Sequence, residues 1–217
     1  VNTASFLGEF FKKSITGEGR EAKPALDRAI AELSSAALAL PILDKELVQI
    51  QTTSLPGQIK AYAKNKQELL SEYSETISLA QNFESLLPDL VGFDDKRVYL
   101  VLLQNNMELR PTGGFIGSYG LLIFENGSLS SFDVFDVYSA DGQLKGHVDP
   151  PIPIRKYLNQ PNWFLRDSNW DPDFQNAALQ ASWFLEKEVD VSVHGVIAVD
   201  VSFAQFLLEA TGPLALS

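Results

Sequence analysis

Two arginines in irregular stretches of the sequence are the residues best placed for anion chemistry. The chain has 217 residues, with 17 Lys and Arg against 28 Asp and Glu, so basic side chains are scarce. Arg110 stands before Pro111, Thr112 and two glycines, Gly113 and Gly114, directly after a run that predicts a strand. The glycines permit positive φ, and converging backbone N–H groups could hold phosphate or carboxylate oxygens. The guanidinium adds donors suited to bidentate phosphate recognition, although a structural turn with Arg110 paired to a carboxylate is the alternative.

The second arginine belongs to a loop that crowds charged, amide and indole side chains together. Closely spaced Asp and Asn oxygens could bind a hard cation such as Mg²⁺ or Ca²⁺, but the Gly and the terminal Glu of an EF-hand loop are missing. Alternatively, Arg166 and Asp167 form an ion pair that anchors the loop, and Asp171 caps the following helix. The two tryptophans would line an apolar or sugar-binding groove, or cover the core. The residues of this loop are Trp163, Arg166, Asp167, Asn169, Trp170, Asp171 and Asp173.

Composition excludes several other classes of chemistry. The chain has no Cys, which rules out disulfides, Cys-based zinc sites and thiol catalysis. With only His147 and His194, neither a His-rich metal site nor a serine-type triad is expected, and a structural role is favoured for His194. The net charge of −11 argues against general nucleic-acid binding. Three carboxylates at Asp133, Asp136 and Asp141 could do acid–base work or hold a metal, but a strand end followed by a turn explains them as well.

The first part of the chain has helical periodicity. Apolar residues recur at three- and four-residue spacing from about residue 23 to residue 87, which predicts two or three long helices in a hairpin or small bundle. We expect Pro24 in a first helical turn, and breaks at Pro41 and at Thr52–Gly57. No apolar run approaches the roughly 20 residues of a membrane-spanning helix. The Phe-rich start is expected to form a helix docked on a core, with an interfacial helix as the alternative; the residues are Phe6, Leu7, Phe10 and Phe11.

After Gly92 the pattern alternates between strands and helices. The pair Asn126-Gly127 predicts a tight hairpin turn. Asp171 and Pro172 are expected at the N-cap and first position of a helix that follows, and Gly212 with Pro213 at the end of the last one. The strand around residue 132 alternates apolar residues on both sides, so both its faces are expected to be partly covered. Strands are predicted over residues 97–104, 118–125, 128–139 and 194–200, and helices over 172–188 and 201–212.

Three long motifs resemble one bacterial family. They are LLQNNMELRPTGGFIGSYG, RDSNWDPDF and VHGVIAVDVSFAQFLLEATGPL, in this order between Arg97 and Leu214. Together they closely resemble the domain-of-unknown-function family 4012 (DUF4012). Members of that family usually carry an N-terminal transmembrane helix followed by a helical stalk. The resemblance therefore implies a full-length protein anchored in a membrane, although the transmembrane segment is not in this chain.

That family is in turn distantly similar to the LytR-CpsA-Psr family. The similarity implies extracytoplasmic enzymes that transfer glycopolymers from a polyprenyl-pyrophosphate carrier to peptidoglycan, using Arg residues and Mg²⁺-bound pyrophosphate beside an apolar lipid tunnel. Arg110 falls where the first pyrophosphate-binding motif, Arg-Ser-Asp-Thr, would lie. Here the sequence continues Pro111-Thr112-Gly113, without the metal-binding Asp. The second motif, Arg-Asp-Thr, would fall near Asp136 to Asp141, where no Arg stands.

These observations predict an α/β (α+β) chain. A helical hairpin or stalk is expected over residues 1–90, and a layered α/β domain that resembles the LytR-CpsA-Psr fold, truncated at its C-terminal end, over residues 91–217. The expected function is extracytoplasmic: binding or transfer of a polyprenyl-pyrophosphate-linked glycopolymer in the cell envelope, with Mg²⁺ as a candidate cofactor. A non-catalytic cell-surface structural or interaction module is the alternative. Expected partners are the glycolipid or a cell-wall glycan, and no nucleic acid. The candidate ligand-binding residues are Arg110, Thr112, Gly113, Gly114, Arg166, Asp167 and Asn169.

Overall fold

The computed structural model describes residues 3–211 and divides the chain into two compact units. The first unit contains the residues up to Lys96 together with Phe124–Leu129, and the second contains Arg97–Ile123 and the residues from Ser130 onward. Phe124–Leu129, the tip of a β-hairpin, therefore belongs to the same unit as the helices. Among the described residues, no helix is both long enough and apolar enough to cross a bilayer.

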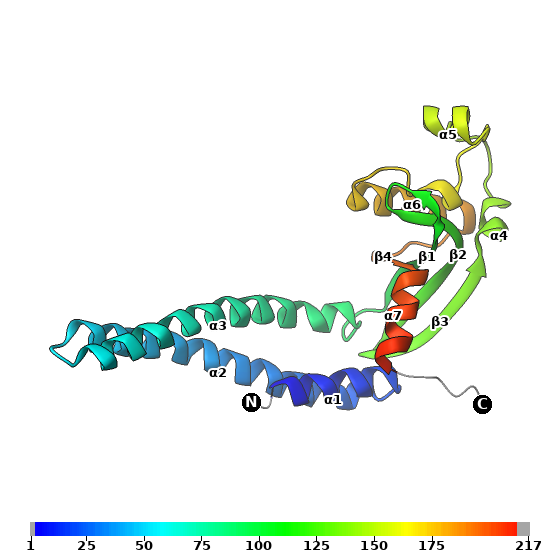
Figure 1. Cartoon of the computed structure of the whole chain (residues 1–217). Helices are drawn as coiled ribbons and strands as arrows, with labels where there is room; N and C mark the ends of the chain where they lie inside the picture. The colour runs from blue at the N-terminus through cyan, green and yellow to red at the C-terminus, as the bar shows by residue number, and fades with distance from the viewer. Residues whose placement is uncertain (1–2, 212–217) are drawn as a thin grey trace. The chain divides into compact units, whose positions relative to one another are not determined.

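The helical unit consists of three helices, α1 (Thr3–Ile15), α2 (Gly19–Thr52) and α3 (Gly57–Leu90). Figure 1 shows α2 and α3 as a long hairpin, with α1 packed along the first part of α2. The break predicted between them is confirmed, because residues 53–56 form the connection. The break predicted at Pro41 is wrong: α2 continues through it, because the loss of one backbone hydrogen bond is a local defect in a helix of 34 residues. Pro24 also lies inside α2 rather than in its first turn.

A small core holds the base of this unit together. Phe10 of α1 is fully buried among residues of α2 and the end of α3, and Leu7 packs against the same cluster, which confirms the docked-helix prediction. The ring of Phe10 lies 6.4 Å from the ring of Phe93. The helix docks because it presents its apolar face to this cluster, while Phe11 stays exposed. The buried members are Phe10, Ala22, Ala25, Leu26, Leu87 and Val91.

The second unit is built on a four-stranded mixed sheet in the order β3-β2-β1-β4. Its strands are β1 (Arg97–Arg110), β2 (Gly113–Glu125), β3 (Ser128–Asp136) and β4 (Gly195–Asp200). The α+β fold class is confirmed. So is the turn at Asn126-Gly127, where both residues have positive φ, 55° and 76°, as a type I′ hairpin requires.

The strand β4 joins β1 in parallel, with Tyr99 opposite Gly195. His194 starts this pairing: its backbone N–H donates to the carbonyl of Val98 at 2.8 Å, and its ring Nδ1 accepts from the Val98 amide at 3.1 Å. The structural role expected for His194 is thus confirmed. The strand β3 lies at the edge of the sheet, and the cover predicted for its two faces is partial: Phe132 and Phe135 are 48% and 39% exposed, and Phe135 stacks on Tyr119.

One long helix and several shorter ones complete this unit. They are α4 (Val137–Asp141), α5 (Ile152–Tyr157), the 3₁₀ helix η1 (Leu165–Asp167), α6 (Phe174–Val189) and α7 (Val201–Thr211). The main core lies between α4, α6, η1 and the sheet. The predicted cap of α6, Asp171, is two residues early: Asp173 is the N-cap, and its side chain accepts from the Gln175 amide at 2.9 Å. The stop predicted at Gly212 and Pro213 lies outside the described residues.

Candidate functional site

The loop around Arg110 is a tight turn between two adjacent strands. Pro111 and Thr112 form the turn itself, and Gly113 opens β2 with φ of 105°, in the region that favours glycine. A Cβ on Gly114 would overlap the backbone carbonyl of Asn105 on β1. Both glycines therefore serve the backbone geometry of the hairpin, which accounts for them without a ligand.

The turn is bound to the second predicted loop by hydrogen bonds. The hydroxyl of Thr112 donates to the backbone carbonyl of Asn169 at 3.1 Å. In return, the side-chain amide of Asn169 donates to the carbonyl of Gly114 at 2.8 Å. Asn169 is fully buried, so its amide is a structural partner of the turn rather than a surface group.

The two arginines meet in one chain of ion pairs, which we call the arginine–aspartate network. Arg110 contacts Asp167 through both Nε and Nη2 at 3.0 Å. Arg166 contacts Asp141 at 2.6 Å, and its Nε lies 3.6 Å from the second oxygen of Asp167. All four side chains are largely buried, with 13% exposure or less. The network links β1, η1 and the end of α4, so its members hold three elements together.

Aromatic rings line the two guanidinium groups. The Arg166 guanidinium carbon lies 4.5 Å from the centre of the Phe164 ring and 5.4 Å from that of Tyr138. The Arg110 guanidinium carbon lies 5.3 Å from the centre of the Phe115 ring. These rings shield the ion pairs from water and add cation–π attraction, which strengthens the existing contacts.

A buried carboxyl group, Glu188 on α6, extends the network. Burial, reinforced by the nearby negative charge of Asp141, raises the pKa of Glu188 from 4.5 to about 8. One oxygen of Glu188 accepts from the Leu165 amide at 3.2 Å, and the other has no hydrogen-bond partner within the described part of the chain. Burial also raises the pKa of Asp141, against the opposing effect of Arg166. At neutral pH, Glu188 is therefore mainly protonated.

The charges of this cluster cancel. Two guanidinium groups face two carboxylates, and Glu188 is mainly uncharged at neutral pH. An incoming phosphate would find no unbalanced positive charge here, and it would have to displace Asp167 or Asp141 from an existing pair. The structure thus brings the predicted ligand-binding residues of the two loops together, with Arg110 paired to Asp167 and with Thr112 and Gly114 bonded to Asn169. The anion in contact with both arginines is the protein's own Asp167.

Sequence reasoning missed Glu188. The signal was present, because Glu188 continues a three- and four-residue repeat of buried positions on α6 through Ala181 and Phe184. A carboxyl group on the apolar stripe of a helix is rarely left without a partner, which marks it as part of a polar cluster.

The carboxylate clusters do not form a metal site. Asp136 caps α4, with its side chain accepting from the Tyr138 amide at 2.7 Å, and Asp171 accepts from the Asp173 amide at 2.8 Å. Within residues 3–211, no group of three His, Asp or Glu side chains is arranged to hold a metal ion. The residues present therefore do not fit a protein-bound Mg²⁺.

Comparison with known proteins gives one match. The model of a family described as "Protein of unknown function (DUF4012)" matches residues 94–217. The match covers more than half of the chain and includes the whole arginine–aspartate network. No curated protein matches, and no solved structure matches.

Proposed function

The chain belongs to the DUF4012 family of proteins of unknown function, and from this premise we propose that it is a non-catalytic interaction module that assembles through its helical hairpin. Two observations shape the proposal. The charges of the polar cluster that could have carried chemistry are balanced by its own ion pairs. The hairpin, in contrast, leaves much of its apolar surface in water.

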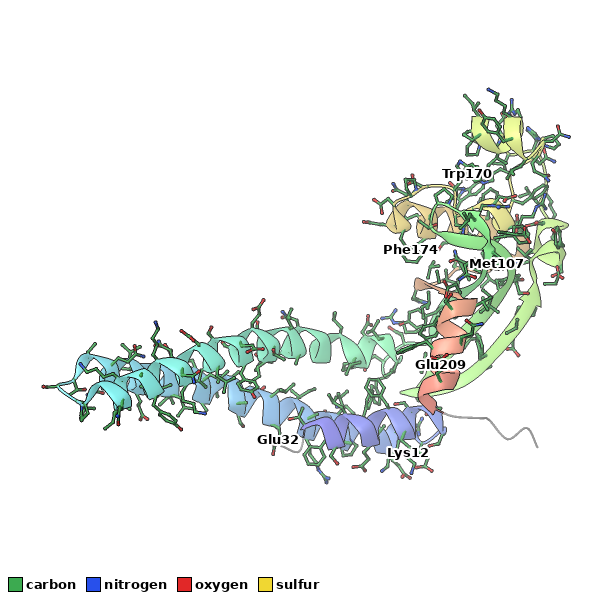
Figure 2. All side chains as sticks on the ribbon, viewed as in Figure 1. Lys12, Glu32, Met107, Trp170, Phe174 and Glu209 are labelled. Carbon is green, nitrogen blue, oxygen red and sulfur yellow. The ribbon has the colours of Figure 1, made fainter. Side chains whose placement is uncertain are left out.

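The observation that carries the proposal is that most large apolar side chains of the outer hairpin, residues 34–86 of α2 and α3, are exposed instead of buried. Between residues 34 and 86, the only fully buried apolar residue among the described side chains is Ala63. Large apolar side chains on the same stretch point into solvent, with exposures up to 75% for Leu38. A surface helix normally buries such residues, and contiguous apolar exposure marks an interaction surface. Figure 2 shows side chains projecting along both helices. The exposed residues are Leu38, Ile42, Leu43, Val48, Leu55, Ile59, Tyr62, Leu69, Tyr73, Leu79 and Leu86.

The seam between α2 and α3 is loosely packed. Gln67 donates to Asp44 at 2.9 Å and accepts from Gln51 at 2.6 Å, so amides occupy positions that a tight helix pair would fill with apolar side chains. An open groove of about 520 Å³ lies between the helices beside Pro41 and Leu70. Each helix has 34 residues and is about 50 Å long. A two-helix hairpin of this length with so small a core gains much of its stability from a partner.

The charges along α3 favour a second copy as the partner. Its first part carries Lys60, Lys64 and Lys66, whereas its middle carries Glu68, Glu72 and Glu75. When two α3 helices lie antiparallel about a point between residues 67 and 68, the basic segment of each faces the acidic segment of the other. Apolar side chains on α3 recur with coiled-coil spacing beside these charges, as such a pair requires. The residues are Ile59, Tyr62, Leu69 and Tyr73.

Sedimentation velocity tests this proposal on the whole chain between about 1 and 200 µM, the range in which a specific dimer dissociates. We expect wild type to form a dimer, and the double substitution Leu69→Ser with Tyr73→Ser to leave it monomeric. The matched control is Ile152→Ser with Tyr157→Ser, which removes two apolar side chains from α5 that are more exposed than Leu69 and Tyr73. A monomeric wild type at the highest concentration, or equal loss in the control, would refute the proposal.

Charge reversal provides a sharper test. A variant with all three lysines changed to Glu should be monomeric, and so should a variant with the three glutamates changed to Lys. An equimolar mixture of the two should form a heterodimer, because each variant supplies the charges that the other lacks. Failure of the mixture to associate, with both variants folded by circular dichroism, argues against antiparallel pairing of α3.

Location in the cell envelope is part of the proposal and is supported by the family resemblance. The glycopolymer function stays a second candidate, and one observation favours it: Arg110 and Arg166 do meet, on either side of Asp167. Titration with geranylgeranyl pyrophosphate, monitored by calorimetry, tests it. The candidate requires binding that is lost in Arg110→Ala; equal affinity in both proteins, or no binding, removes it.

A further inference from the structure

A cavity beside α6 is lined by two indole rings and by uncharged hydrogen-bonding groups, and we propose that it binds a neutral saccharide. We call it the Trp pocket. Its volume is about 470 Å³, within the range of about 300–1,000 Å³ typical of small-molecule sites. It lies in the second unit, and the proposal is independent of self-association. Its lining residues are Pro151, Trp163, Ser168, Trp170, Asp171, Pro172, Asn176 and Gln180.

The aromatic wall is fixed in place before any ligand arrives. The indole N–H of Trp163 donates to the backbone carbonyl of Asp167 at 2.8 Å. The Trp163 ring also packs edge-on against Phe184 of the core at 5.3 Å. Trp170, labelled in Figure 2, belongs to the segment that leads into α6 and is partly exposed. Two partly buried indoles around one cavity form a preorganised apolar surface, which lowers the entropic cost of binding a flat ligand face.

One polar side chain in the lining lacks a partner. Ser168 is 1% exposed, and its hydroxyl makes no hydrogen bond within the described part of the chain. A buried hydroxyl without a partner is energetically costly, and a rotation of the Ser168 side chain toward the cavity that it lines would let a ligand hydroxyl satisfy it. Asn176 uses its NH₂ group to donate to Asp171 at 3.3 Å, which leaves its carbonyl oxygen as an acceptor. Gln180 adds an acceptor and two donors on the next turn of α6.

The charges of the lining select against ionic ligands. No Lys or Arg is among the lining residues, so a phosphate or a uronate would have no counter-charge. The single carboxylate, Asp171, already accepts from the Asp173 amide through one oxygen and from Asn176 through the other, so a cation would compete with these bonds. A neutral ligand with several hydroxyl groups and an apolar face matches both surfaces. These are the features of a sugar ring.

The test uses the whole chain labelled with ¹⁵N, and maltotriose, cellotriose and chitotriose as probes. We expect at least one trisaccharide to shift the indole N–H resonance of Trp170 in a saturable way below about 20 mM, since millimolar affinity corresponds to a single shallow sugar site. Trp170→Leu and Ser168→Ala should each weaken that binding about fivefold or more, the loss expected for one hydrogen bond or one stacking contact. Leu179→Ala, an exposed position on α6 outside the pocket, is the matched control and should bind like wild type.

Three results would overturn the proposal. The first is the absence of a saturable shift with all three sugars up to about 20 mM, which would mean that any binding is weaker than millimolar. The second is binding that both pocket substitutions leave unchanged while their circular dichroism spectra match wild type. The third is saturation of the pocket by tetramethylammonium or by a proline-rich peptide but not by sugars, which would assign it to a cation or to a peptide.

Discussion

Replacing Glu188 by Gln should change how the stability of the α/β unit depends on pH. The folded state holds this carboxyl group with a pKa of about 8, whereas its ordinary value is 4.5. Between these values the folded chain keeps a proton that the unfolded chain releases. The resulting stability is therefore fully present below about pH 4.5 and is lost as the pH rises through about 8. The raised pKa of Asp141 acts in the same direction.

The size of the effect follows from the two pKa values. Between about pH 5.5 and pH 8.5, the linkage relation gives a loss of roughly 3 kcal/mol in the free energy of unfolding for wild type. Gln cannot ionise, yet its oxygen can still accept from the Leu165 amide as Glu188 does at 3.2 Å. We therefore expect Glu188→Gln to remove most of this slope and to be the more stable protein at the higher pH.

Urea denaturation followed by tryptophan fluorescence measures this quantity. All three tryptophans, Trp163, Trp170 and Trp183, belong to the α/β unit, so the signal reports on that unit alone. The matched control is Glu186→Gln, an exposed carboxylate on the same helix, which should keep the wild-type slope. The reasoning is refuted if wild-type stability is constant or rises over this pH range, or if Glu188→Gln retains the slope.

Three further substitutions test the contacts around the turn and the helix. Arg110→Met should lower the free energy of unfolding by about 2–4 kcal/mol, because it leaves the buried Asp167 with only the more distant Arg166 as its counter-charge. Gly114→Ala should cost about 1–3 kcal/mol, because the new methyl group meets the backbone of the neighbouring strand. Asp173→Ala should cost about 1 kcal/mol through loss of the α6 N-cap. Urea denaturation measures all three.

Each of these substitutions has a control in the same chain. Arg155→Met removes an exposed ion pair and should change stability by less than about 1 kcal/mol. Gly117→Ala places a methyl group at ordinary contact distance and should be tolerated. Asp173→Asn keeps a side-chain oxygen at the cap and should stay close to wild type. If a control substitution lowers the free energy of unfolding as much as the substitution that it is paired with, the assigned contact is not the cause.

Local patterns predicted most of the elements. The Asn126-Gly127 turn, the docked first helix and the strand over residues 194–200 follow from residue types that leave few alternatives, whereas the parallel pairing of β4 was not predicted. The break predicted at Pro41 was wrong because a proline weakens a helix only locally, and the helical pattern continues on both sides of it. Asp171 and Asp173 both have side chains that can cap the N-terminus of α6, and the backbone conformation determines that Asp173 does so.

The convergence of the two loops was predicted from residue type, but the partner of each arginine was not. Arg110 and Asp167 are 57 residues apart in the sequence, and no local pattern links them. A sequence shows which side chains could hold an anion. It does not show that a neighbouring carboxylate has already taken that position, because this depends on the path of the chain through η1.

The parallel pairing of β1 with β4 has a consequence for synthesis on the ribosome. His194 and Val98, the first residues to join, are 96 positions apart. At about 5–20 residues per second, the inner edge of β1 waits roughly 5–20 seconds for its neighbour to be translated. During that interval its hydrogen-bonding groups are open to other nascent chains, so the yield of folded protein should depend on chaperone supply and on the speed of elongation.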